Sequence, residues 1–312
     1  MPLSIGSFGW SRQPERFRAY AATLPSGDDF WSLLEAKDDN GDRFCYRALT
    51  LALRLQNNTR WLSGGRLVSL DQKQVGSCVG HGEATRGSVL AALDCYYRGE
   101  PEKFVNILCP EWSYYASRVE CGMIGRGDGS TGEGAAKAAT KHGVLPKGKY
   151  GSVDCSEYTE ARCRSWGDGK QLPAEVIAEA KPHVASQYIA CDTSQKVWLA
   201  AGAALPINFC SMQGFEGKRD ADGAIRPKGQ WPHSMAGGTA RYTTKAGRRL
   251  VLVHQSWGND WTDGPYYLDQ PWGSFYADLD VLGEMASEGD TFIDIGYAGE
   301  AWPNLPPDFT QI

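Results

Sequence analysis

The apolar residues in the first two thirds of the chain recur at the spacing of an α-helix. The clearest case is a helix from Cys78 to about Tyr97, ended by the polar and breaking residues at 98–101. One face of this helix carries apolar side chains at i, i+3, i+4 and i+7, namely Val89, Ala92, Leu93 and Tyr96. Similar patterns predict helices over 46–53, 110–121, 133–142, 173–185 and 194–203, and an irregular stretch over 144–172.

The pattern changes after residue 205, where short apolar runs between turn residues replace the helical spacing. A short strand over 66–70 is also expected, just before the loop that leads to Cys78. The later runs predict strands over 205–210, 239–243, 250–255, 265–268 and 291–295, with one further helix over 277–285. A helical first half followed by a β-rich second half predicts an α+β fold of two packed lobes.

These patterns divide the chain into four expected segments. A chain of 312 residues, 42% of them hydrophobic, is long enough to bury a large core. The segments are an N-terminal arm and helix over 1–60, a helical lobe over 61–190, a β-rich lobe over 191–298, and an extended C-terminal tail over 299–312.

Charge and cysteine content narrow the class of protein. The formal net charge of −5, without a basic stripe, argues against nucleic acid as a partner. Neither a secretory signal nor an apolar run of membrane-spanning length is visible, so we expect no membrane partner and a location in the cytoplasm or in a virion. The nine cysteines are expected to be mostly free, buried thiols. No Cys-x-x-Cys pair occurs, and we expect neither a metal nor an organic cofactor.

Cys78 is the first candidate for chemistry. It ends a polar, glycine-containing loop and stands at the start of the predicted helix that follows. Unpaired backbone N–H groups and the helix dipole favour negative charge at such a position. Because this setting favours the reactive thiolate, we predict that Cys78 is a nucleophile.

A thiol nucleophile needs a base and a group that orients the base. His233 is the best candidate for the base, since it stands at the entry to a predicted β segment. Gln255 follows in the chain and begins the run Gln-Ser-Trp-Gly, and its carboxamide can accept an imidazole N–H. His81, three residues beyond Cys78, is a lesser alternative for the base.

The other three histidines are interpreted as structural. His142 and His183 stand at apparent helix ends, where an imidazole caps carbonyl groups. His254 is adjacent to Gln255 in the expected strand, so its side chain should point to the opposite face.

Three blocks of sequence, in the right order, resemble the papain-like cysteine peptidases. Residues 72–78, Gln-Lys-Gln-Val-Gly-Ser-Cys, are similar to the family's Gln-x-x-Cys-Gly-Ser-Cys. Residues 233–236 are similar to its His-Ala-Val region, and residues 255–261 to its Asn-Ser-Trp-Gly-x-x-Trp. The resemblance covers roughly residues 60–296, and the segments 112–115 and 132–146 look like the bacterial and phage branch.

The resemblance implies a papain-like two-lobed fold with a central helix after Cys78, and the activity of a cysteine-type peptidase. Cys78 would be the nucleophile and His233 the base. Gln72 would supply the oxyanion donor together with the Cys78 backbone N–H, and Gln255 would orient His233. The residues expected to shield this site or border the substrate cleft are Trp257, Val79, Gly129 and Ser130.

The chain departs from the family pattern at several positions. Gln255 stands where the family has asparagine, which adds a methylene between the backbone and the amide. Val79 replaces an aromatic residue, which opens the cleft wall, and Val75 replaces a cysteine, so one family disulfide cannot form. Residues 1–60 do not resemble the family's inhibitory propeptide.

Three functions remain open on the sequence. The leading hypothesis is hydrolysis of peptide bonds through a Cys-His-Gln triad. The first alternative keeps the fold and acts on peptidoglycan as an amidase or endopeptidase. The second is a papain-fold structural or interaction protein with weak or no catalysis, such as a phage-particle component that assembles through its terminal arms.

Overall fold

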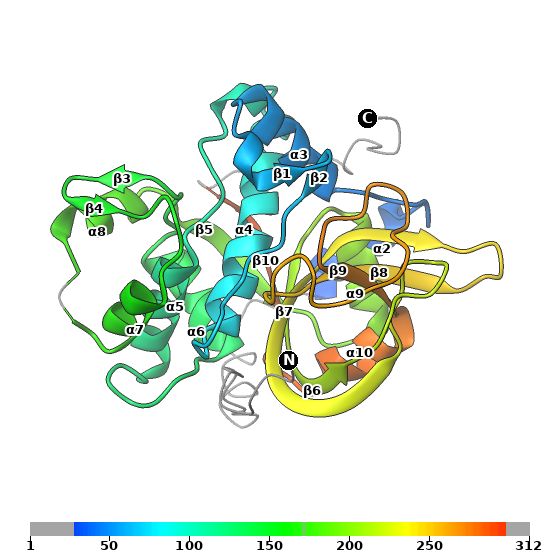
Figure 1. Cartoon of the computed structure of the whole chain (residues 1–312). Helices are drawn as coiled ribbons and strands as arrows, with labels where there is room; N and C mark the ends of the chain where they lie inside the picture. The colour runs from blue at the N-terminus through cyan, green and yellow to red at the C-terminus, as the bar shows by residue number, and fades with distance from the viewer. Residues whose placement is uncertain (1–27, 171, 298–312) are drawn as a thin grey trace.

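The computed structural model describes residues 28–170 and 172–297 of the chain, so the predictions for most of the N-terminal arm and for the 299–312 tail lie outside the described residues. Figure 1 shows a helical part beside a β-rich part, with helix α4 (Cys78–Tyr97) between them. This arrangement confirms the predicted α+β class.

Helix α4 is the central element, and its observed bounds match the prediction. It contacts α3, α5 and α6 on the helical side and β6, β7 and β10 of the sheet. Small residues make this packing possible. A Cβ at Gly80 would meet Tyr114 of α5 at 2.7 Å, and a Cβ at Gly82 would meet the Asn208 side chain of β6 at 2.5 Å. Both neighbours can therefore approach the first turns of α4 closely.

The helical part differs from the prediction between residues 144 and 185. The stretch 144–172, expected to be irregular, contains a small hairpin and helix α7 (Glu160–Gly167), whose N-terminus is capped by the Thr159 side chain. The predicted helix 173–185 is shorter as α8 (Ala174–Ala180), since the chain turns and enters a strand. The remaining elements before the sheet are α2 (Asp28–Lys37), α3 (Tyr46–Leu55), η2 (Thr59–Trp61), β1 (Leu62–Ser63), β2 (Arg66–Leu67), η3 (Pro101–Lys103), α5 (Pro110–Cys121), α6 (Gly132–Lys141), β3 (Lys149–Tyr150) and β4 (Val153–Asp154).

A six-stranded antiparallel sheet in the order β5-β10-β6-β7-β8-β9 forms the β-rich part. The expected strand 239–243 is only the end of the 17-residue β7, and the expected strand 265–268 does not form; β9 lies further along the chain. The elements of this part are β5 (Ala185–Ala190), α9 (Ser194–Gly202), β6 (Ile207–Phe215), β7 (Pro227–Thr243), β8 (Arg249–His254), β9 (Ser274–Asp278), α10 (Leu279–Ser287) and β10 (Phe292–Tyr297).

Both faces of this sheet are covered, which explains why residues 250–253 of β8 are all apolar. Val251 and Val253 pack into the cluster that contains residues of α9 and α10. Leu250 and Leu252 point the other way, into the cluster that contains residues of α3 and α4. Successive side chains of a strand face opposite sides, so a strand covered on both sides is apolar at every position.

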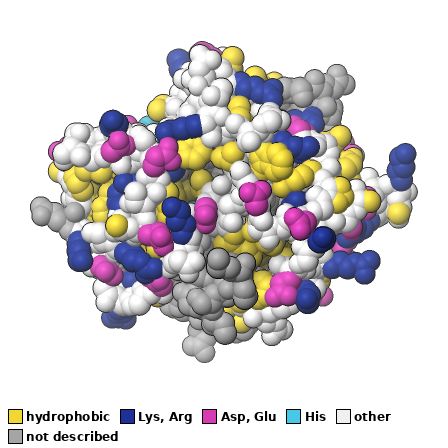
Figure 2. Space-filling model, viewed as in Figure 1, with side chains coloured by type: hydrophobic (Ala, Val, Ile, Leu, Met, Phe, Trp, Pro, Cys, Tyr) yellow, Lys and Arg dark blue, Asp and Glu magenta, His cyan; other side chains and the backbone are white. Residues whose placement is uncertain are grey.

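The surface carries charged side chains of both signs (Figure 2), whereas the cysteines are buried. On the face shown in Figure 2, acidic and basic side chains are interspersed over the helical part. All nine cysteines lie in the described residues as buried thiols, which confirms that expectation. None of the helices in the described part of the chain combines the length and apolarity that a bilayer crossing requires.

Candidate active site

Cys78 is the first residue of α4, so its thiol stands at the N-terminal end of the central helix. The residue is fully buried in a small cluster with Val79, Ala135 and Cys210, and Met212 packs against that cluster. The N-terminal end of a helix favours a thiolate, whereas apolar surroundings act in the opposite direction.

His233 of β7 and Gln255, the residue that directly follows β8, form a direct hydrogen bond. The register pairs Ala236 of β7 with His254 of β8, which brings His233 and Gln255 to the same end of this strand pair. His233 Nε2 and Gln255 Oε1 are 2.6 Å apart, and both residues are buried. The longer glutamine side chain therefore reaches the imidazole that the sequence assigned to it.

The sheet also carries His233 to the neighbourhood of Cys78. Strand β6 pairs with β7 so that Cys210 lies opposite Ser234, the residue after His233. Cys210 itself packs in the cluster that contains Cys78. A Cβ at Gly82 of α4 would lie 3.3 Å from the Ser234 hydroxyl oxygen, so the first turns of α4 lie directly against the part of β7 that bears His233.

Burial sets the protonation of His233. Removal from water lowers the pKa of the imidazole to about 4, although the Gln255 hydrogen bond acts in the opposite direction. Since the amide oxygen of Gln255 can only accept, Nε2 carries the proton in the neutral ring. Nδ1 is then the nitrogen that is able to receive a proton.

Trp257 covers the imidazole. Its ring stacks on the His233 ring with the centroids 4.7 Å apart and an interplanar angle of 26°. Trp231 and Trp261 contact Trp257 in turn, at centroid distances of 6.3 and 5.3 Å. This aromatic layer excludes water from one side of the His233–Gln255 bond.

Gln72 is buried and held by the residue after Gln255. Its backbone N–H donates to the Ser256 carbonyl at 2.8 Å, and the Ser256 hydroxyl donates to Gln72 Oε1 at 2.6 Å. Gln72 Nε2 donates to the Val75 carbonyl at 3.0 Å. Sequence reasoning did not single out Ser256, although it stands in the block that pointed to Gln255 and Trp257.

Of the residues expected to border the cleft, Val79 and Ser130 are buried and Gly129 lies in a loop. Val79 is buried beside Cys78. The Ser130 hydroxyl donates to Ser117 Oγ at 2.7 Å, so this side chain packs against α5 in the interior. Gly129 has a φ of 112°, in the region that favours glycine, at the end of the loop before α6.

Arg118, which sequence reasoning missed, organises the glycine-rich loop over residues 125–132, between α5 and α6. This guanidinium is buried and donates to the Gly129 carbonyl at 2.6 Å and to the Gly167 carbonyl at 2.9 Å. It also donates to the carbonyl groups of Met123 and Arg126. The available signal for such a role was a basic residue within the half-apolar sequence of helix α5.

His81 contacts Ser77, the N-cap residue of its own helix α4. Its Nδ1 lies 3.1 Å from the Ser77 carbonyl oxygen, and its ring packs edge-on against Tyr158 at a centroid distance of 4.8 Å. Burial lowers the pKa of His81 to about 3. These contacts give the ring a structural role beneath the loop that precedes Cys78.

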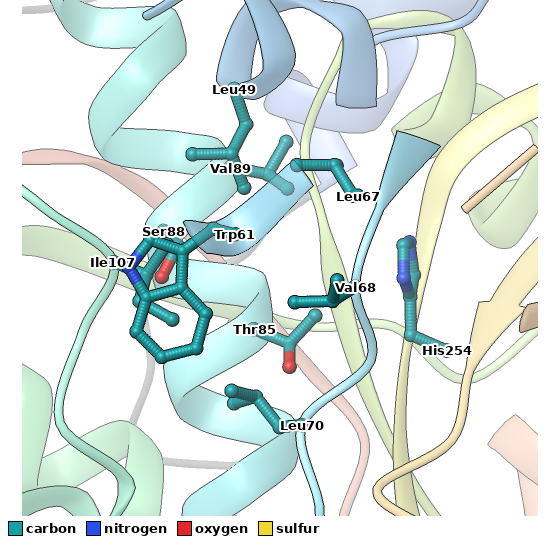
Figure 3. Close-up of a pocket in the computed structure, with 10 residues that line it drawn as sticks. All are labelled: Leu49, Trp61, Leu67, Val68, Leu70, Thr85, Ser88, Val89, Ile107 and His254. Atoms are coloured by element: carbon teal, nitrogen blue, oxygen red, sulfur yellow. The ribbon is translucent and has the colours of Figure 1, made fainter. Parts of the chain in front are cut away.

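His254 points away from Gln255, as the strand alternation predicts. Its Nε2 lies 2.6 Å from the Thr239 hydroxyl. The ring lines a cavity of about 30 Å³ between α3, α4 and the segment before Cys78 (Figure 3). The other lining residues are mainly apolar: Leu49, Trp61, Leu67, Val68, Leu70, Thr85, Ser88, Val89 and Ile107. A space of that size holds a single water.

His142 is the C-cap residue of α6, and its Nε2 lies 2.8 Å from a carboxylate oxygen of Glu120. His183 lines a second cavity, of about 150 Å³, at the other end of α4. Within residues 28–170 and 172–297, no group of three or more His, Cys, Asp or Glu side chains is arranged to hold a metal ion.

Comparison with solved structures identifies the fold. Xylellain, a cysteine protease from Xylella fastidiosa, is 14% identical; the match covers 93% of this chain and 92% of that chain, with a TM-score of 0.52. The Amb a 11 cysteine protease, a ragweed pollen allergen in its proform, is 16% identical, with coverages of 94% and 77% and a TM-score of 0.54. No model of a protein family matches the sequence, and no curated protein is significantly similar to it. The chain therefore has the papain-like fold, the fold of these cysteine proteases.

Proposed function

We propose that this protein is a thiol hydrolase that cleaves peptide bonds. The observation that carries the proposal is the buried 2.6 Å bond between His233 Nε2 and Gln255 Oε1, covered by Trp257. It orients the imidazole so that Nδ1 is the nitrogen available for proton transfer with the Cys78 thiol. Gln255 stands where the family has asparagine, and the longer side chain still makes the hydrogen bond to His233 that an active site requires.

In the proposed reaction the Cys78 thiol transfers its proton to His233, and the thiolate attacks the scissile carbonyl carbon. His233 then protonates the leaving amine as the carbon–nitrogen bond breaks, which leaves an acyl-enzyme on Cys78. A water molecule, deprotonated by His233, attacks the thioester and releases the acid. The Gln72 side-chain amide and the Cys78 backbone N–H would stabilise the oxyanion in both steps.

Cleavage of an unfolded protein such as reduced, carboxymethylated casein tests the proposal. We expect Cys78→Ala to abolish cleavage, because the nucleophile is lost. Cys95→Ala is the matched control, since Cys95 lies near the far end of the same helix and burial raises the pKa of its thiol. Intact cleavage by Cys78→Ala would contradict the proposal.

The same assay separates the alternative functions. Cleavage of muropeptides without cleavage of casein would favour a peptidoglycan amidase or endopeptidase of the bacterial and phage branch. Slow alkylation of Cys78, no turnover of either substrate, and stable incorporation into a larger particle would favour a structural component of a virion. Rapid alkylation of Cys78 with casein turnover supports the peptidase.

A further inference from the structure

The loop between Gln72 and Cys78 is held from outside by side chains of the helical part. Asp128 Oδ2 accepts from the Gly76 backbone N–H at 3.1 Å. Glu160 Oε1 accepts from the Gln74 N–H at 3.0 Å, and the Arg164 guanidinium donates to the Gln74 carbonyl. Three successive peptide units of the loop, from 73–74 to 75–76, therefore depend on contacts that are distant in the sequence.

Asp128 and Arg164 contact each other, and Glu160 lies on the same helix as Arg164. Asp128 belongs to the glycine-rich loop between α5 and α6, whereas Glu160 and Arg164 lie one turn apart on α7. Arg164 Nη1 also lies 3.3 Å from Asp128 Oδ2, the same oxygen that binds the Gly76 N–H. The carboxylate thus joins the loop to α7 through a single atom.

The contacts of Asp128, Glu160 and Arg164, called the clamp below, hold the loop 72–77, which also carries the Gln72 amide. Gln72 Nε2 donates to the Val75 carbonyl at 3.0 Å, and the Val75 N–H points back to the Gln72 carbonyl at 3.3 Å. The position of the Val75–Gly76 peptide therefore sets the direction of the Gln72 amide. Val75 carries no thiol, so no covalent cross-link holds the loop at this point.

We propose that Asp128 and Arg164 are positioning residues that keep the loop 72–77, and with it the Gln72 amide, in its working geometry. The proposal rests on the proposed function, in which Gln72 donates to the oxyanion. Neither residue touches the reacting atoms. Their effect passes through the backbone of Gln74 and Gly76 and is felt mainly in the transition state, where the oxyanion forms.

Exposure of the two side chains makes the proposal testable. The side chains of Asp128 and Arg164 are 32% and 47% exposed, so their removal should leave the core intact, as surface substitutions generally do. Gly76, in contrast, is buried, and its N–H loses its acceptor when the Asp128 carboxylate is removed.

The test compares Asp128→Ala with Asp128→Asn and with Glu157→Ala. Asparagine keeps an oxygen for the Gly76 N–H but removes the charge that faces Arg164. Glu157 is the matched control, because its carboxylate pairs with Arg60 at 3.1 Å on the surface. The measurements are kcat and KM for a peptide substrate, the rate of Cys78 alkylation by iodoacetamide, and hydrogen exchange of the Gln74 and Gly76 amides.

We expect Asp128→Ala to lower kcat about tenfold or more, with KM and the alkylation rate within about twofold of wild type. Its Gly76 amide should exchange at least about tenfold faster. Asp128→Asn should fall between wild type and alanine, and Glu157→Ala should match wild type. If Asp128→Ala does not fold, Asp128→Asn decides by the same measurements.

Wild-type kcat together with unchanged Gly76 exchange in the Asp128 variants would overturn the proposal. An equal effect of Glu157→Ala would also overturn it, since that variant does not touch the loop. If the wild-type protein cleaves no peptide, the proposed function fails, and hydrogen exchange alone decides whether the clamp exists. Faster exchange then supports the clamp, and unchanged exchange refutes it.

Discussion

Shortening Gln255 to asparagine should damage the site, although asparagine is the residue of the family that the sequence resembles. In this protein the backbone positions of β7 and β8 place the glutamine oxygen 2.6 Å from His233 Nε2. Removing one methylene withdraws the amide by about 1.5 Å, one carbon–carbon bond length. The oxygen would then lie about 4 Å from Nε2, beyond hydrogen-bond distance.

The expected loss follows from the buried donor that remains. His233 is fully buried, so its Nε2–H without an acceptor costs about 1–3 kcal/mol and releases the ring orientation. At about 1.4 kcal/mol for each factor of ten, kcat should fall about 5- to 150-fold. The loss of kcat in Gln255→Ala should lie in the same range, since both variants leave the His233 Nε2–H without an acceptor.

The assay is steady-state hydrolysis of a fluorogenic peptide, with the iodoacetamide alkylation rate of Cys78 measured in parallel. The control is Gln213→Asn, which shortens a glutamine of β6 whose side-chain amide donates to the backbone carbonyls of Gly214 and Gly229. A Gln255→Asn variant as fast as wild type, or faster, would refute the reasoning from side-chain length.

Three further predictions concern the surroundings of the site. Trp257→Ala removes the ring stacked on His233, so water should weaken the His233–Gln255 bond and kcat should fall about tenfold or more, with Trp272→Ala, which removes a half-buried ring, as the control. Arg118→Met leaves buried loop carbonyls without their donor, so the free energy of unfolding in urea should fall by about 3–5 kcal/mol, and a loss below about 1 kcal/mol would contradict this role. Burial lowers the pKa of His254 from 6.5 to about 4, so the stability it contributes is present above pH 6.5 and is lost as the pH falls towards 4. His254→Gln should therefore lose about 2 kcal/mol less than wild type between about pH 7 and pH 4.5, and an identical pH dependence would refute the assignment.

The sequence predicted the elements that carry strong local signals. Helix α4 was predicted to its observed bounds because apolar residues recur at helical spacing between the Cys78 loop and the break at Gly99. Helix α5 was predicted from its first-turn proline. Short polar α7 was missed because only Cys163, Trp166 and Gly167 are buried, too few to produce a period.

The strands were less predictable because tertiary contacts decide them. Strand β7 begins at Pro227 and contains Gly229, residues that disfavour a strand in isolation, yet pairing with β6 extends it through bulges. The stretch 265–268 has strand-like composition but finds no partner strand. Composition reports a preference, whereas a strand exists only where a neighbour supplies its hydrogen bonds.

The candidate site divides in the same way. Local patterns of the chain pointed to Cys78, His233 and Gln255, namely a loop before a helix and a histidine followed by an amide, and the family resemblance added Gln72. Whether the longer amide reaches the imidazole depends on the β7–β8 register, which no local pattern encodes. The contacts of Asp128 and Arg164 with the loop likewise join residues 52 and 90 positions apart, so only the packing of α7 and the glycine-rich loop against residues 72–77 could reveal them.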